Sequence, residues 1–388
     1  MSADRWRHAA SVAGVAFLLR AAAALLSDRT VADVLRYHKL GAHILDVSWN
    51  PYAAARLYPY PPVWVWVEAG AEWLARHAAV PFPLAVKAPV VLADALLAGL
   101  IAAWTHGTAG IARGAGWLYA VHPIALLVVG FHGQFDAVAL LALVCALGWL
   151  REGRLDRSAL ALSAGIALKS FPVLVLPFAL LFVERPRARV RYAALAVLPV
   201  LLILAPFAIA DPRALVRELF AYGGIPDFGW IGGLRAVRSE LIGRVARASA
   251  EEWTPLLEAS KLLFLVAAAG LWAACAAERR KWRPESCALA VLLAFQVFYG
   301  ALSAQYLLWP VPFALLLGER FTTLHAGVSS VALVGFYLFL APGVLTPADL
   351  APWSPAVSQR LWMAGTVGLW LTSVVWLADL VRRERVRT

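Results

Sequence analysis

The chain alternates long apolar runs with short polar breaks from one end to the other. A helix needs about 20 apolar residues to cross the hydrocarbon core of a bilayer, and about thirteen runs are candidates on this criterion. The runs are continuous and rich in Ala and Leu, which is typical of helices rather than of alternating barrel strands. They lie near 9–26, 61–78, 84–104, 115–130, 134–150, 158–168, 170–183, 190–210, 259–277, 286–302, 304–317, 321–341 and 360–381. The pattern predicts an all-α, polytopic transmembrane helix bundle of about 12 spans, forming one domain over residues 1–388.

Positive charge concentrates in the short breaks between the runs. The net charge is +11, and Lys and Arg are in excess in the cytoplasmic loops of membrane proteins. The Arg-rich breaks lie near 151–157, 185–191, 279–283 and 382–387. We therefore expect both termini in the cytoplasm and the loops 27–60 and 211–258 on the outer face. This distribution speaks against nucleic-acid binding.

Two cytoplasmic termini require an even number of crossings, whereas the runs number about thirteen. We therefore expect one run between 61 and 130 not to cross fully. One candidate is 61–78, which carries Glu68 and Glu72, and the other is 115–130, which His122 and Pro123 interrupt.

The first outer loop is polar and aromatic although the chain around it suits lipid. Within it, apolar residues at three- and four-residue steps predict a short amphipathic helix over 31–46 lying along the membrane surface. Asp33 lies in its first turn and has two interpretations. Thr30-x-x-Asp33 resembles a capping box, while a carboxylate at the bilayer surface suits a general base. Tyr37 and His38, from the same segment, are candidate substrate ligands.

A second polar group lies between two apolar runs, in Gly130-Phe-His-Gly-Gln-Phe-Asp136. His132, Gln134 and Asp136 place an imidazole, an amide and a carboxylate where ionisable groups are costly and often functional. The alternative is a polar loop in which Asp136 is a helix N-cap. Our topology puts these residues on the same side as the first outer loop.

Cations within apolar runs have two interpretations as well. Lys169, in Ala-Leu-Lys-Ser-Phe-Pro172, and Arg20, in the first run, could snorkel to the headgroups or bind a phosphate. Lys87 and Asp94 are seven residues apart, two turns on one helix face, and are expected to pair.

Aromatic and amide residues begin several runs. Tyr58 and Tyr60, in Tyr-Pro-Tyr-Pro-Pro62, are expected at interface depth as belt residues, with sugar stacking as the functional alternative. Gln305 and Tyr306 begin another run and are expected to face the outer surface.

The common catalytic and nucleotide-binding motifs are missing from the sequence. It contains no P-loop, no dinucleotide glycine fingerprint, no HExxH and no GxSxG. The three Cys fit neither a metal-ligand spacing nor a disulfide framework. We expect no cofactor and no metal.

The order of these motifs resembles the GT-C superfamily of membrane glycosyltransferases. The resemblance rests on Asp33-x-x-x-Tyr37 after the first run, Tyr60-Pro-Pro, His132-Gly-Gln-Phe-Asp136, Ala167-Leu-Lys-Ser-Phe-Pro172 and Ser303-Ala-Gln-Tyr-Leu-Leu-Trp. The series looks most like bacterial polyprenyl-phosphate-mannose-dependent mannosyltransferases of the GT87 type.

The resemblance implies a bundle of GT-C type and an inverting transfer of a hexose at the outer face of a bacterial plasma membrane. For the GT87 type, the hexose is mannose. The partners it implies are a polyprenyl-phosphate sugar donor, a glycolipid or glycan acceptor, and membrane lipid. It assigns Asp33 as the catalytic acidic residue and Lys169 as the matching lysine. The residues expected to bind donor phosphate or substrate are Lys169, His132, Gln134, Asp136, Arg20, Tyr37, His38, Tyr60, Gln305 and Tyr306.

Two other classes of function remain open from the residues. Arg20, Glu68, Lys87 and Asp94 within apolar runs are also typical of a transporter or lipid flippase. The chain could also be a structural membrane subunit of a polysaccharide assembly complex.

Overall fold

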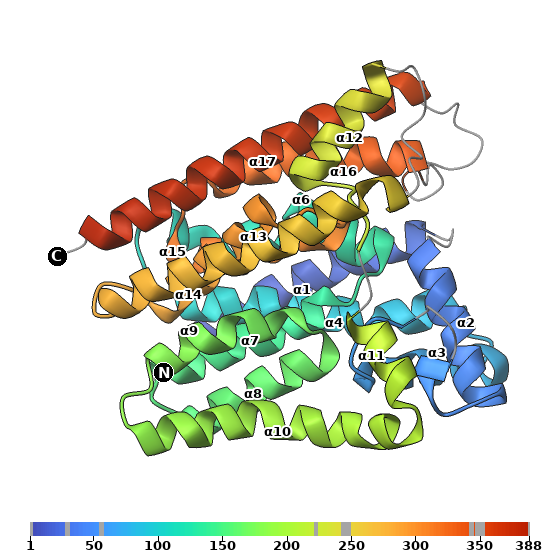
Figure 1. The fold of residues 1–388 in the computed structure, drawn as a ribbon, viewed down its shortest axis with the longest axis horizontal. Coiled ribbons are helices and arrows are strands. Elements are labelled where there is room, and N and C mark those ends of the chain that lie inside the picture. The colour runs from blue at the N-terminus through green and yellow to red at the C-terminus, as the bar shows by residue number, and fades with distance from the viewer. Residues whose placement is uncertain are drawn as a thin grey trace. The chain divides into compact units, whose positions relative to one another are not determined.

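The structure is a computed structural model that describes residues 3–27, 32–53, 58–220, 224–241, 250–340, 345 and 354–386. Every named element in these ranges is helical, and one isolated bridge joins Phe228 to Leu302. Each of the apolar runs contains a helix (Figure 1). The predicted all-α fold is therefore confirmed.

The chain divides into two compact units. The first unit comprises Met1–Ala103 and Val129–Tyr222, and the second comprises Trp104–Val128 and Gly223–Thr388. The single domain expected over the whole chain stays a prediction.

The first unit carries all but one of the polar motifs singled out in the sequence. Its helices α7, α8 and α10 run side by side, and α2 packs against α3 (Figure 1). The helices are α1 (Ala3–Leu26), α2 (Ala32–Asp46), α3 (Val63–His77), α4 (Phe82–Thr105), α7 (Asp136–Arg151), α8 (Leu155–Leu168), α9 (Leu176–Leu181), α10 (Pro186–Ala210) and α11 (Pro212–Phe220). Short 3-10 turns lie at Pro51–Ala53 and Phe171–Val175.

The second unit is built around two long C-terminal helices, α16 and α17, which pack on each other. Its helices are α5 (Ala115–Ala120), α6 (Pro123–Ala125), α12 (Gly229–Leu241), α13 (Ala250–Ala277), α14 (Pro284–Phe298), α15 (Val311–Leu317), α16 (Thr322–Leu340) and α17 (Pro355–Val386). Within the run 115–130, α5 ends at Ala120 and α6 begins at Pro123, yet Ala112–His132 as a whole is long and apolar enough to cross a membrane.

Within the described ranges, 7 helices are long and apolar enough to cross a membrane. Other apolar runs form helices that are shorter than a full span. One is α3, with 15 residues, and another is α7, with 16 residues. The protein is an integral membrane protein, and about 12 spans stays a prediction.

The amphipathic helix expected over 31–46 is confirmed as α2. Val34, Tyr37, Leu40 and Gly41 form its buried face. Gly41 lets α2 approach α3 closely, because a Cβ there would lie 2.6 Å from a backbone oxygen of α3. Thr30, the proposed cap, lies outside the described residues, so the capping box stays untested.

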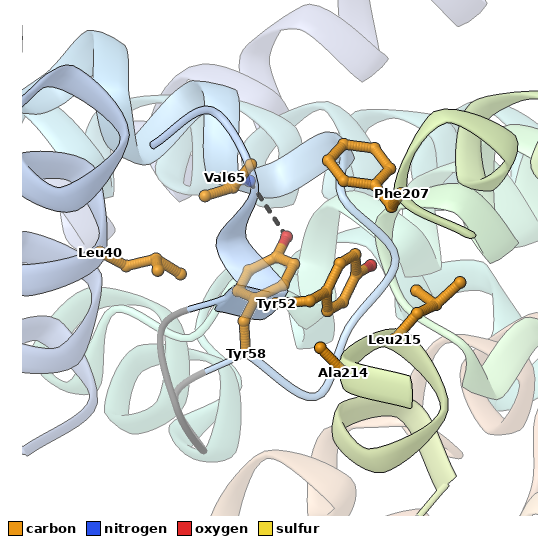
Figure 2. Close-up of a cluster of buried hydrophobic side chains, with 7 residues drawn as sticks. All are labelled: Leu40, Tyr52, Tyr58, Val65, Phe207, Ala214 and Leu215. Carbon is orange, nitrogen blue, oxygen red and sulfur yellow. Dashed lines mark hydrogen bonds between the residues drawn. The ribbon is translucent and has the colours of Figure 1, made fainter. Parts of the chain in front are cut away.

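Tyr58 is buried inside the first unit, whereas the sequence suggests a belt residue at the membrane interface. Its side chain is 1% exposed. Its hydroxyl accepts a hydrogen bond from the Val65 backbone N–H at 3.0 Å and donates to the Pro61 carbonyl at 2.9 Å. Figure 2 shows this contact inside a cluster with Leu40, Tyr52 and Phe207. Tyr58 therefore satisfies a free amide in the first turn of α3, the role of an N-cap.

We expect Tyr58→Phe to lower the free energy of unfolding by about 1–2 kcal/mol, because the Val65 amide would be buried without an acceptor. Tyr52→Phe should cost less, because it removes a donor to the Tyr60 carbonyl and strands no amide. Denaturant unfolding in mixed micelles measures both, and equal losses would contradict the capping role.

Candidate active site

His132 and Gln134, from the second motif, meet the carboxylate of Asp33, which lies 99 and 101 residues earlier in the sequence. Oδ2 of Asp33, in the first turn of α2, accepts a hydrogen bond from Nε2 of Gln134 at 2.5 Å. Nε2 of His132 lies 3.0 Å from the same oxygen. Because that oxygen is an acceptor, His132 presents an N–H to it. The predicted meeting of the first outer loop with the second motif is therefore observed.

The orientation of the Gln134 amide is fixed by two donors on its far side. Its Oε1 accepts from the Tyr37 hydroxyl at 3.1 Å and from Lys169 Nζ at 3.5 Å. Lysine can only donate, so the amide oxygen must face Lys169 and the amide nitrogen must face Asp33. Tyr37 and Lys169 thus act on the carboxylate through Gln134.

Lys169 is buried among aromatic rings and a carboxylate. It is 3% exposed and forms an ion pair with Asp136. Its ammonium also lies 4.4 Å from the centroid of the Phe135 ring and 4.9 Å from that of Tyr60. Lys169 therefore does not snorkel to the surface, and Asp136 compensates its charge. Tyr60 therefore contributes one of the two aromatic rings beside the Lys169 ammonium.

Local backbone features shape the loop that carries His132 and Gln134. A π-helical stretch, Leu126–His132, ends at His132, and such stretches are common at functional sites. Gly133 then adopts a positive φ of 83°, which favours glycine. The loop turns there before α7 begins at Asp136, which lies in the first turn of α7.

Oδ1 of Asp33 is the carboxylate oxygen that His132 and Gln134 do not contact. The side chain is 31% exposed, and a guanidinium nitrogen of Arg36 lies 3.6 Å from Oδ1. Burial raises the pKa of this carboxyl, but the hydrogen bond and charge of His132, with Arg36 and Lys169, outweigh it and hold the pKa below the usual 3.8. Asp33 is therefore ionised at neutral pH, as a general base must be.

We expect His132→Phe to shift the acid limb of the pH–rate profile upward, because the hydrogen bond and charge of His132 lower the pKa of Asp33. A lowered pKa keeps Asp33 ionised as the pH falls, so activity is lost only when the pH drops below that pKa. Removing His132 leaves the effect of burial, which raises the pKa. The kcat/KM profile measures this, with His77→Phe, at an exposed position on α3, as the control. An unmoved acid limb would contradict the role of His132.

Several residues predicted for the site lie elsewhere. Arg20 is fully buried and pairs with Asp94 at 2.6 Å, so it neither snorkels nor reaches headgroups. The expected pairing of Lys87 with Asp94 is therefore wrong. His38 lies 2.7 Å from a carboxylate oxygen of Glu72 on α3, away from the Asp33 contacts.

Gln305 and Tyr306 belong to the second unit. They form part of the 3-10 turn Ala304–Leu308, where Gln305 is buried. The Tyr306 carbonyl accepts a hydrogen bond from Gln296 at 2.9 Å. Their expected role at the outer surface stays a prediction.

Three residues of the site were missed from the sequence. Arg36 follows Asp33 by one helical turn, and this spacing could have suggested the ion pair. Phe135 stacks on Trp64 of α3 with ring centroids 4.5 Å apart and planes at 7°. Nothing in the local sequence around Trp64 signals that contact.

The site offers a carboxylate and several hydrogen-bond donors. Among the described residues, no group of three or more His, Cys, Asp and Glu side chains could hold a metal ion. The arrangement suits proton removal from a hydroxyl by Asp33.

Comparison with known proteins supports the family resemblance inferred from the motifs. No curated protein matches this sequence. ArnT from Cupriavidus metallidurans, solved bound to undecaprenyl phosphate, is similar with a TM-score of 0.49 and 16% identity, over 100% of this chain and 78% of that chain. The sequence profile of glycosyltransferase family 87 matches residues 58–302, a stretch that includes His132, Gln134 and Lys169. Because this stretch is more than half of the 388 residues, the chain belongs to glycosyltransferase family 87.

Proposed function

We propose that this chain is an inverting hexosyltransferase that transfers mannose from a polyprenyl-phosphate donor to a hydroxyl of a lipid-linked or glycan acceptor. One observation carries the proposal. Gln134 and His132 hold Oδ2 of Asp33, while Oδ1 stays open beside the exposed cation Arg36. Family membership supports glycosyl transfer, and the order of motifs supports the lipid-phosphate donor and mannose.

In the proposed reaction, Oδ1 of Asp33 removes the proton from the acceptor hydroxyl. The acceptor oxygen forms a bond to the anomeric carbon while the bond from that carbon to the donor's phosphate oxygen breaks. The product sugar has the inverted configuration, and polyprenyl phosphate leaves with the electron pair. Phosphate is a competent leaving group, so no second protein acid is needed.

Arg36 is our candidate for stabilising the departing phosphate. Its side chain is 49% exposed, whereas Lys169 already pairs with Asp136. A cation placed where charge develops lowers the barrier. In this scheme Lys169 orients Gln134. The sequence instead suggests that Lys169 binds the phosphate directly.

The site is proposed to lie on the outer face, with both termini in the cytoplasm. The Arg-rich breaks support this orientation through the positive-inside rule. Arg20 and Asp94 form an ion pair and neutralise each other. These two intramembrane charges therefore no longer favour a transporter.

The proposal is tested with the purified chain, a polyprenyl-phosphate mannose labelled in the sugar, and glycolipid extract as acceptor. We expect label in a covalent product and release of polyprenyl phosphate. Counterflow of label across liposomes without a covalent product would favour transport. Activity that appears only when a partner protein is added would favour a structural subunit.

A further inference from the structure

Lys87 is a buried cation that the proposed reaction does not use. It lies in α4 and is 2% exposed. Its ammonium donates to Ser27 Oγ at 2.7 Å and to the Phe131 carbonyl at 2.8 Å. Among the described residues, no carboxylate forms an ion pair with it. Ammonium groups at membrane depth are costly and are usually kept for function.

The two acceptors belong to the two segments that build the site. Ser27 directly follows α1 and precedes α2, which carries Asp33. Phe131 directly precedes His132 in the loop that reaches back to Asp33. Ser27 Oγ also lies 3.3 Å from the Phe131 carbonyl. Lys87 therefore links both segments through a single nitrogen atom.

The loop also packs directly on the side chain of Lys87. At Gly133, a Cβ would lie 2.9 Å from both Cγ and Cε of Lys87. The backbone there has a φ of 83°. The turn between His132 and Gln134 is thus fitted around the lysine, so a change in this side chain is transmitted to both residues.

We propose that Lys87 is a positioning residue for glycosyl transfer, which fixes the end of α1 against the loop so that His132 and Gln134 meet Asp33. This inference rests on the proposed function. Lys87 acts through the backbone of the loop, because its described hydrogen bonds reach Ser27 and Phe131 only. A misplacement of about 1 Å at a reacting group costs about 100-fold in rate.

The test compares Lys87→Met with Lys87→Gln, whose amide keeps a donor for the Phe131 carbonyl. We expect Lys87→Met to lower kcat by about 10- to 100-fold with donor KM within about threefold, because orientation is lost while the substrate contacts remain. Lys87→Gln should recover part of the loss. Lys39→Met, which removes an exposed cation from α2, is the matched control and should leave kcat unchanged.

The pH profile separates positioning from a merely structural role. Loosening His132 and Gln134 should move the acid limb upward in Lys87→Met and leave it in place in Lys39→Met. The groups facing the Asp33 carboxylate are His132 and Gln134 from the loop, Arg36 and Tyr37 from α2, and Lys169 from the end of α8.

A second readout does not depend on transfer. The ring signals of His132, in histidine-labelled protein assigned with His132→Asn, should shift in Lys87→Met. If the parent protein transfers no sugar, the proposed function fails while this signal still tests the positioning. If Lys87→Met does not fold, kcat, the acid limb and the His132 signal of Lys87→Gln and Ser27→Ala decide whether Lys87 positions the loop. Parent-like kcat, acid limb and His132 signal in the folded variants would overturn the inference.

Discussion

Asp33→Asn is expected to lower kcat by about 10²- to 10⁴-fold, the range found when a general base is removed. Asparagine has the same shape and still accepts a hydrogen bond from Gln134, so the loop should keep its place. The amide does not take a proton from a hydroxyl. The lipid donor should therefore still bind while transfer stops.

The matched control is Asp46→Asn, the same change at the other end of α2. Asp46 is 51% exposed and pairs with Arg76, so its loss should leave transfer unchanged. The measurements are kcat with the labelled donor and direct binding of that donor. Near-normal kcat in Asp33→Asn would show that the base is another group.

Lys169→Met is expected to destabilise the protein by about 3–5 kcal/mol, the usual cost of removing one partner from a buried ion pair. The side chain of Asp136 is 0% exposed and would be left buried without its cation. The variant should also lose activity, because Gln134 would lose the donor that sets its orientation.

The double variant Lys169→Met with Asp136→Asn separates the two effects. Removing both charges should recover most of the free energy of unfolding without restoring transfer. Arg191→Met, in the exposed pair with Asp156, is the control and should change stability little. Full recovery of transfer in the double variant would mean that Lys169 does not orient Gln134.

The sequence predicts the helices well because lipid imposes a simple rule on them. A spanning segment must be long, apolar and helical, so each apolar run could be assigned without tertiary information. The three- and four-residue spacing in 31–46 likewise sufficed to predict α2.

Pairings between helices were harder to predict. A period of 3.6 residues says which side chains share a face and not which neighbour that face meets. Lys87 and Asp94 share a face of α4, yet Asp94 pairs with Arg20. The ion pair of Lys169 with Asp136 and the cap provided by Tyr58 also depend on how separate segments pack. The motifs of the site could be located from the sequence, whereas the contacts of their side chains could not.

The most direct test of the central claim is the anomeric configuration of the sugar that the purified chain attaches to its acceptor. Nuclear magnetic resonance of the product, formed from a polyprenyl-phosphate hexose of known configuration, measures it. A single displacement assisted by Asp33 predicts a product of the opposite configuration. A product of the same configuration, or transport of the labelled substrate with no covalent product, would contradict the account.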